Sequence, residues 1–114
     1  MQLRKNAVLL RIFVGEDDKA DGRPLYEALV LKAREMHVAG ATVLRGPLGF
    51  GQSSHLQTTK ILRLSQDPPI VIEIVDEERK VREFLTAVEP MMTSGLVTLE
   101  NVQVLRYGNE PADD

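Results

Sequence analysis

The sequence predicts one α+β domain whose elements follow the order β-α-β-β-α-β. Two segments carry apolar residues at the spacing of a helix face, and the shorter runs around them are rich in β-branched and apolar residues. The length of 114 residues fits a single domain. Because the chain supplies only two convincing helices, a doubly wound parallel sheet is the less favoured alternative.

The first half of the chain predicts a strand, a helix and a second strand. Residues 7–14 form an apolar run that a polar loop interrupts, and residues 41–45 form the second run. Pro24 suits the first turn of a helix, where its missing N–H is not needed. Gly40 is the expected helix stop. The apolar stripe of this helix consists of Leu25, Ala28, Leu29, Ala33 and Met36.

The second half predicts a strand, a helix and a last strand. Two prolines, Pro68 and Pro69, impose an extended entry into a strand over residues 70–75. Asp76 is the expected N-cap of the second helix, Gly95 marks that helix's end, and residues 61–64 are left open as a strand or a turn. The helix stripe consists of Val81, Phe84, Leu85, Val88 and Met92.

The last predicted strand covers residues 96–107, and a bend at residues 100–101 is one option for it. The domain is therefore expected to span residues 1–107. Residues 108–114 are polar and acidic, and we expect them to form a flexible tail.

This element order is typical of the ferredoxin-like fold, a four-stranded antiparallel sheet with both helices on one face. Strands of such a sheet should be polar on the uncovered side. Here that side also carries apolar residues, which predicts an oligomer interface. Its members would be Arg11, Phe13, Val71, Glu73 and Val75. The first and third strands are neighbours in this fold, so Arg11 and Glu73 are expected to pair; two separate solvated charges are the alternative.

Composition excludes several classes of function. The chain has no cysteine, which excludes disulfides and thiol nucleophiles, and no histidine cluster has metal-binding spacing. A net charge of −3 argues against binding a nucleic-acid polymer. No apolar run is long enough for membrane insertion, and no secretory signal is present, so a cytoplasmic location is expected.

The glycine-rich run that begins at residue 46 is the main candidate for ligand binding. Gly46, Gly49 and Gly51 permit close backbone approach, and successive N–H groups in such a turn can bind an anion. Arg45 and His55 could add contacts to a phosphate. The spacing matches neither a Walker loop nor a dinucleotide fingerprint, so a turn without a ligand is an equal alternative. We assign no catalytic residue.

From Arg45 the chain has RGPLGFG and then His55, and later come LSQDPPIVIEIVD (residues 64–76) and GLVTLE (residues 95–100). Together these motifs resemble an uncharacterised bacterial and archaeal family related to the PII signalling proteins. The resemblance implies a homotrimer whose sheets line the centre and which binds AMP, ADP or ATP between subunits. It places Arg45, Gly46, Gly49 and Gly51 where the ligand-closing loop begins, and Ser65 in a second shared motif.

The resemblance further implies that residues 46–60 signal to a regulated partner protein. Some family members accompany fluoride exporters, which suggests a membrane transporter as that partner. The leading hypothesis is a non-enzymatic PII-like sensor of a small anion. Two alternatives stay open: a small enzyme that uses His55 as general acid or base, and a structural adaptor whose uncovered sheet face binds another protein.

Overall fold

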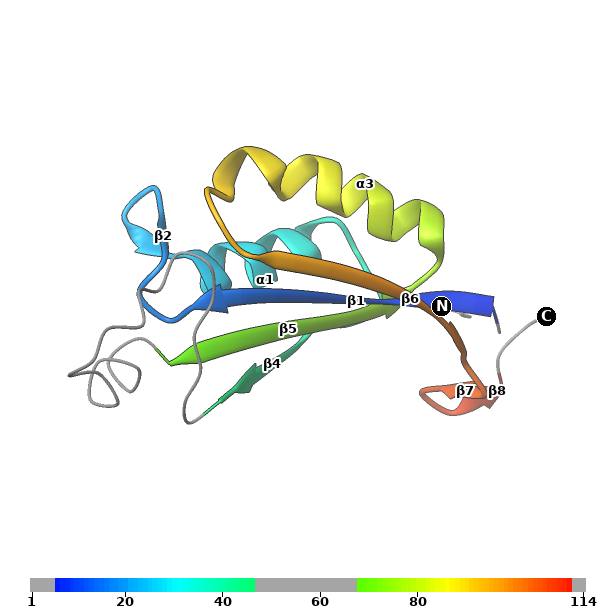
Figure 1. The fold of residues 1–114 in the computed structure, drawn as a ribbon. Coiled ribbons are helices and arrows are strands. Elements are labelled where there is room, and N and C mark those ends of the chain that lie inside the picture. Colours follow the sequence, from blue (N-terminus) through cyan, green and yellow to red (C-terminus); the bar gives the residue numbers. More distant parts are fainter. Residues whose placement is uncertain (1–5, 47–67, 112–114) are drawn as a thin grey trace.

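In the computed structural model, which describes residues 6–46 and 68–111, the fold is a four-stranded antiparallel sheet with two helices on one face (Figure 1). The sheet has the order β4-β5-β1-β6, so the first strand is central. The strands are β1 (Asn6–Gly15), β4 (Thr42–Arg45), β5 (Pro69–Asp76) and β6 (Leu96–Gln103), and the helices are α1 (Leu25–Glu35) and α3 (Glu78–Val88). The predicted ferredoxin-like fold is confirmed.

Two short hairpins and one 3-10 turn extend this frame. The strands β2 (Lys19–Ala20) and β3 (Arg23–Pro24) form a hairpin before α1, and η1 (Glu89–Met91) is a 3-10 turn after α3. The strands β7 (Arg106–Tyr107) and β8 (Glu110–Pro111) form a second hairpin after β6. Within the part of the chain that the structure describes, no helix is long and apolar enough to cross a membrane.

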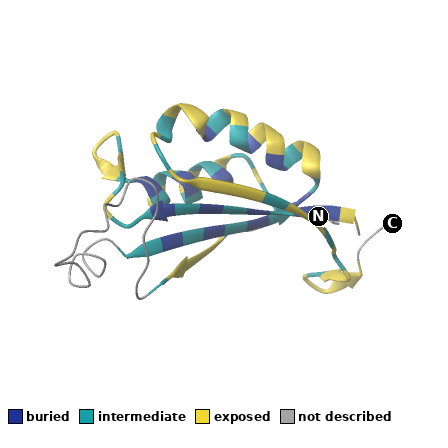
Figure 2. Ribbon diagram, viewed as in Figure 1, coloured by how far each residue is buried: buried dark blue, intermediate teal, exposed yellow. Residues whose placement is uncertain are grey.

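The hydrophobic core lies between the sheet and the helices. Burial alternates along β1 and β5, because successive side chains of a strand point to opposite faces (Figure 2). Each fully buried aliphatic or aromatic side chain contributes about 1.5–3 kcal/mol. The core residues are Val8, Leu10, Ile12, Val14, Leu25, Leu29, Ala33, Ile70, Ile72, Ile74, Val81, Phe84 and Val88.

Helix boundaries differ from the sequence prediction at three places. Pro24 is the N-cap of α1 and lies just before the helix. That helix ends well before Gly40, and His37 takes the left-handed conformation (φ +59°), while the Val38 N–H donates to the Ala33 carbonyl. The second helix becomes a 3-10 turn after Val88, because Pro90 has no N–H for the next α-helical bond.

Asp76 was expected to cap α3, but it is the last residue of β5, and Glu77 is the N-cap. The Asp76 carboxylate is fully buried and accepts two backbone hydrogen bonds, from Glu77 N (2.7 Å) and from Ala39 N (2.8 Å). Lys80 Nζ lies 3.7 Å from the same carboxylate. Asp76 therefore ties the sheet to the segment that follows α1.

The C-terminal strand also differs from its prediction. The strand β6 passes through residues 100–101 without a break and ends at Gln103. Gly108 (φ +65°) then allows a turn that pairs Glu110 and Pro111 with β7, at positions where a flexible tail was expected. The hydroxyl of Tyr107 donates to the carbonyl of Ala39, so this hairpin is fastened to the chain just before β4.

Candidate functional site

The face of the sheet opposite the helices carries the residues that the sequence predicted as an oligomer interface. Arg11 is the register partner of Glu73, and Phe13 is the partner of Val71, so the members of each pair are neighbours on adjacent strands. Leu44 on β4 (47% exposed) and Leu96 on β6 (57% exposed) share this face, since they are the partners of Val71 and Phe13. We call this surface the open face.

An ion-pair cluster lies near the middle of the open face. Arg11 Nε donates to Glu73 Oε2 (2.9 Å), and Arg11 Nη1 donates to Glu100 Oε1 (2.7 Å). The predicted Arg11–Glu73 pair is confirmed, and the alternative of two separate charges is wrong. Sequence reasoning missed Glu100, because only the pairing of β1 with β6 brings it beside Arg11.

The electrostatics of this cluster leave it with one surplus negative charge. Hydrogen bonds to Glu73, and then to Glu100, raise the pKa of Arg11 above its ordinary value. Because the pKa is raised, the two ion pairs of Arg11 stabilise the fold fully at any pH below the ordinary arginine pKa. Their contribution is lost only as the pH rises above that value. Arg11 therefore stays charged at every pH that the folded protein would ordinarily meet.

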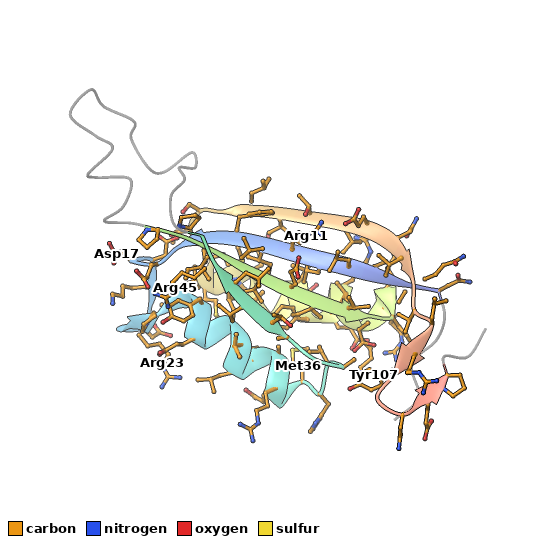
Figure 3. The ribbon with its side chains drawn as sticks, turned by 90° about the horizontal axis from the view of Figure 1, so that it is seen from below. Arg11, Asp17, Arg23, Met36, Arg45 and Tyr107 are labelled. Carbon is orange, nitrogen blue, oxygen red and sulfur yellow. The ribbon has the colours of Figure 1, made fainter. Side chains whose placement is uncertain are left out.

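Arg45 lies at one end of the sheet, at the last position of β4 (Figure 3). Its guanidinium group forms an ion pair with Glu16 and lies 5.8 Å from the centre of the Tyr26 ring. The side chain is 51% exposed, so a ligand can reach it. An incoming anion would have to compete with Glu16 for this arginine, and the Tyr26 ring lies within the range of a cation–π contact with it.

Gly46 lies at the same end of the sheet, directly after β4 and beside the first residue of β5. Its N–H donates to the carbonyl of Pro69 (2.8 Å), and a Cβ atom at this position would lie 2.8 Å from Pro69 Cγ. The glycine is thus explained by close packing on the proline. Because this N–H is already bonded, Gly46 itself does not offer it to an anion in this structure.

The other predicted ligand-binding residues lie outside the residues that the structure describes. They are Gly49, Gly51, His55 and Ser65, and the proposed closing loop of residues 46–60 falls there too except for Gly46. The structure therefore brings Arg45 and Gly46 together with Glu16, Tyr26 and Pro69, and sequence reasoning had named only the first two.

Comparison with solved structures defines the class of this fold. It is similar to CPII of Thiomonas intermedia K12 in a structure with ADP and bicarbonate (TM-score 0.64, 21% identity, 89% of this chain and 90% of that one). It is also similar to a putative PII-like signaling protein of Thermus thermophilus (TM-score 0.60, 18% identity, 91% and 93% covered). The fold is that of PII-like proteins.

The chain belongs to the DUF190 family, described as "Uncharacterized ACR", which matches residues 7–104. A UPF0166 protein of Aquifex aeolicus is 40% identical over 97 residues, which cover 85% of this chain and 91% of that protein. A UPF0166 protein of Methanocaldococcus jannaschii is 30% identical over 101 residues, with 88% and 93% covered. The family resemblance inferred from the motifs is thus confirmed.

Proposed function

We propose that this protein is a PII-like regulator that assembles into a homotrimer and binds an adenine nucleotide between neighbouring copies. The ligand's phosphates would contact Arg45, and residues 46–60 would carry the signal to a regulated protein. The mechanism is a binding-dependent ordering of this segment, which changes the surface shown to the partner.

The observation that carries the proposal is the placement of Arg45. It is half-exposed, it ends strand β4, and the glycine-rich segment begins at the next residue. Arginine binds phosphate oxygens through two parallel N–H groups, and a glycine-rich sequence permits close backbone approach to a ligand. The solved CPII structures support an adenine nucleotide as the ligand, since they are named for bound ADP, AMP and bicarbonate.

The open face supports assembly. Phe13 and Val71 are only partly buried there, and Leu44 and Leu96 are about half exposed. A contiguous apolar surface of this kind is usually covered by another protein surface. If copies pack these faces together, their sheet edges approach one another, and Arg45 at the edge strand β4 would lie near a neighbouring copy.

Isothermal titration calorimetry with AMP, ADP, ATP and cyclic AMP tests the ligand. We expect saturable binding of at least one nucleotide, weakened about tenfold or more by Arg45→Gln, because a charge-assisted hydrogen bond contributes about 1.5–3 kcal/mol. The matched control is Arg34→Gln, an exposed arginine in the last turn of α1, which should leave the affinity unchanged.

Light scattering measures the assembly separately. A mass of three chains is the expected result, and a monomer that still binds nucleotide would remove the inter-copy site from the proposal. The absence of heat with all four nucleotides would remove the nucleotide itself.

A further inference from the structure

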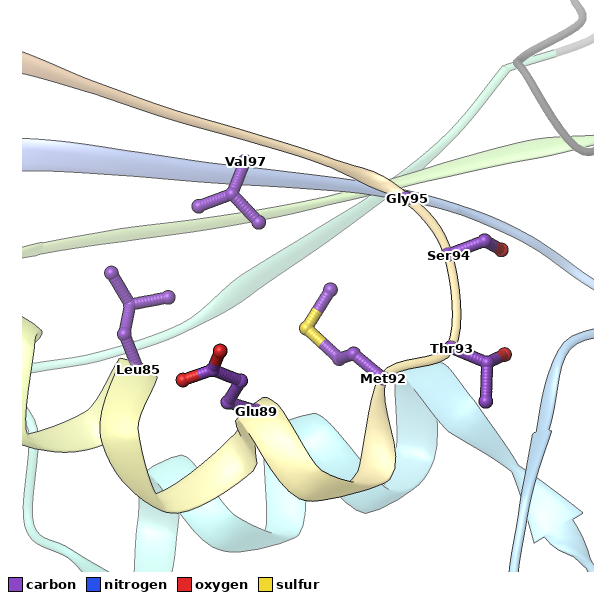
Figure 4. Close-up of a pocket in the computed structure, with 7 residues that line it drawn as sticks. All are labelled: Leu85, Glu89, Met92, Thr93, Ser94, Gly95 and Val97. Carbon is purple, nitrogen blue, oxygen red and sulfur yellow. The ribbon is translucent and has the colours of Figure 1, made fainter.

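A pocket of about 330 Å³ opens where η1 leads into β6, on the helix side of the sheet (Figure 4). Its volume lies in the range of about 300–1,000 Å³ that small-molecule sites occupy. The lining residues are Leu85, Glu89, Met92, Thr93, Ser94, Gly95 and Val97. None of them belongs to the site around Arg45, and β6 and β4 are opposite edges of the sheet.

Three of the seven lining residues have apolar side chains. Leu85 comes from α3, Met92 follows η1, and Val97 comes from β6 (Figure 4). Val97 is the register partner of the core residue Ile12 and so faces the helices, yet it is 40% exposed. The helix layer therefore stops short of this edge strand, and an apolar surface remains there for a ligand to cover.

The backbone at position 95, which lines the pocket, requires glycine. Its φ of +131° is one that L side chains rarely adopt, and a Cβ atom would lie 2.9 Å from the Phe13 carbonyl oxygen. The same Cβ would lie 3.4 Å from the Met92 methyl carbon. The bare backbone at Gly95 thus forms one wall, and the Met92 methyl group lies against it as part of the pocket surface.

The single charge in the pocket is the carboxylate of Glu89, which points toward the space between Leu85, Met92 and Val97 (Figure 4). Within residues 6–46 and 68–111 this carboxylate has no hydrogen-bond or ion-pair partner. The nearest arginines along α3 are engaged elsewhere, Arg79 with Glu83 and Arg82 with Glu78. Residues 89–97 contain no lysine or arginine.

We propose that this pocket binds a small monocationic amine or guanidinium compound that carries a short apolar chain. The ammonium or guanidinium group donates to the Glu89 carboxylate, and the chain packs against Leu85, Met92 and Val97. The unpaired carboxylate repels phosphate and carboxylate ligands. The protein therefore has a second ligand site whose charge preference is opposite to that of Arg45, and this site does not depend on the proposed nucleotide function.

Three probes with one common chain test the charge preference: pentylamine, pentanol and pentanoate. Binding is followed by NMR on protein with ¹³C-labelled methionine methyl groups. The chain has four methionines, and Met92→Leu assigns the pocket resonance. We expect a saturable shift of the Met92 methyl signal with pentylamine, a weaker one with pentanol and none with pentanoate.

Two variants separate the charge from the apolar side chains. Glu89→Gln should weaken the affinity for pentylamine about fivefold, because an exposed ion pair contributes up to about that factor to an affinity. The affinity for pentanol should stay unchanged. Val97→Phe, a substitution that suits a strand, should fill the pocket and remove binding of both probes. The matched control is Glu110→Gln, which removes an equal charge from the hairpin at the far end of the molecule (Figure 1).

Several results would overturn the proposal. These are equal shifts with pentanoate and pentylamine, an unchanged pentylamine affinity in Glu89→Gln, or no Met92 shift with any probe. Thermal unfolding of each variant shows that the fold is retained, so a loss of binding can be assigned to the pocket. Arg45→Gln should leave amine binding intact, and therefore failure of the nucleotide proposal leaves this result unaffected.

Discussion

Asp76 offers the clearest test of how the described fold is held together. Its carboxylate is fully buried at the end of β5 and accepts hydrogen bonds from the N–H groups of Glu77 and Ala39. Asp76→Ala removes both acceptor oxygens and leaves the two backbone donors, which belong to half-buried residues, without this partner. The side chain of Lys80, 3.7 Å away, loses its charge partner as well.

The expected loss follows from these contacts. A hydrogen bond to a charged group contributes about 1.5–3 kcal/mol, so two such bonds predict a destabilisation of about 3–6 kcal/mol. A domain of this size has a total stability of about 5–15 kcal/mol, which makes this loss a large share of the whole. The melting temperature should fall by roughly 12–24 °C, at about 4 °C per kcal/mol.

Urea unfolding followed by circular dichroism measures this change. Asp76→Asn, which keeps one acceptor oxygen, should lose less than Asp76→Ala does. The control Glu83→Ala breaks an exposed ion pair with Arg79 on α3 and should cost about 0.5 kcal/mol or less. A loss below about 1 kcal/mol in Asp76→Ala would refute the view that this carboxylate joins β5 to the segment after α1.

Three further predictions concern a backbone position, a hairpin and the open face. Gly95→Ala should lower the free energy of unfolding in urea by about 1–3 kcal/mol, because position 95 has a positive φ and the new Cβ would lie too close to the Phe13 carbonyl oxygen. Gly40→Ala, with open space around the new Cβ, should change that free energy little. Tyr107→Phe should cost about 0.5–1.5 kcal/mol and speed amide exchange in the β7–β8 hairpin; unchanged exchange would argue against the hydrogen bond to Ala39. Glu73→Ala should reduce assembly in sedimentation, because it removes one partner of Arg11 on the open face, and an unaltered mass would count against that face as the interface.

Much of the fold could be predicted from local pattern. The strand over residues 70–75 and the stripe Val81, Phe84 and Val88 each follow from a periodicity that one element carries alone. The Arg11–Glu73 pair was also predictable, since it needs only the neighbour relation that the element order implies. The ends of the helices were less predictable. Pro90, which ends the α-helical part of the second helix, is visible in the sequence, but the left-handed conformation at His37 occurs without a glycine that would indicate it.

The candidate sites likewise have a part that could be predicted from the sequence and a part that could not. Arg45 was predictable because it adjoins a glycine-rich run, whereas its contacts with Glu16 and Tyr26 depend on how the loop after β1 and helix α1 come to lie beside β4. Glu89 looked like an ordinary surface acid near the end of a helix. Its position in a pocket became visible only when η1 was placed against β6.

By itself, the sequence determined the fold class, the two helix stripes, the apolar open face and the family, because each of these depends on residue order and spacing. Tertiary structure alone decided that Glu100 joins Arg11, that Asp76 receives the Ala39 N–H, and that Glu89 faces Met92 and Val97. Some of these contacts join residues that are distant in sequence, and others depend on a local turn of the backbone. In both cases the geometry of the contact depends on the packing of the whole domain. Residue spacing along the chain carries no information about that geometry.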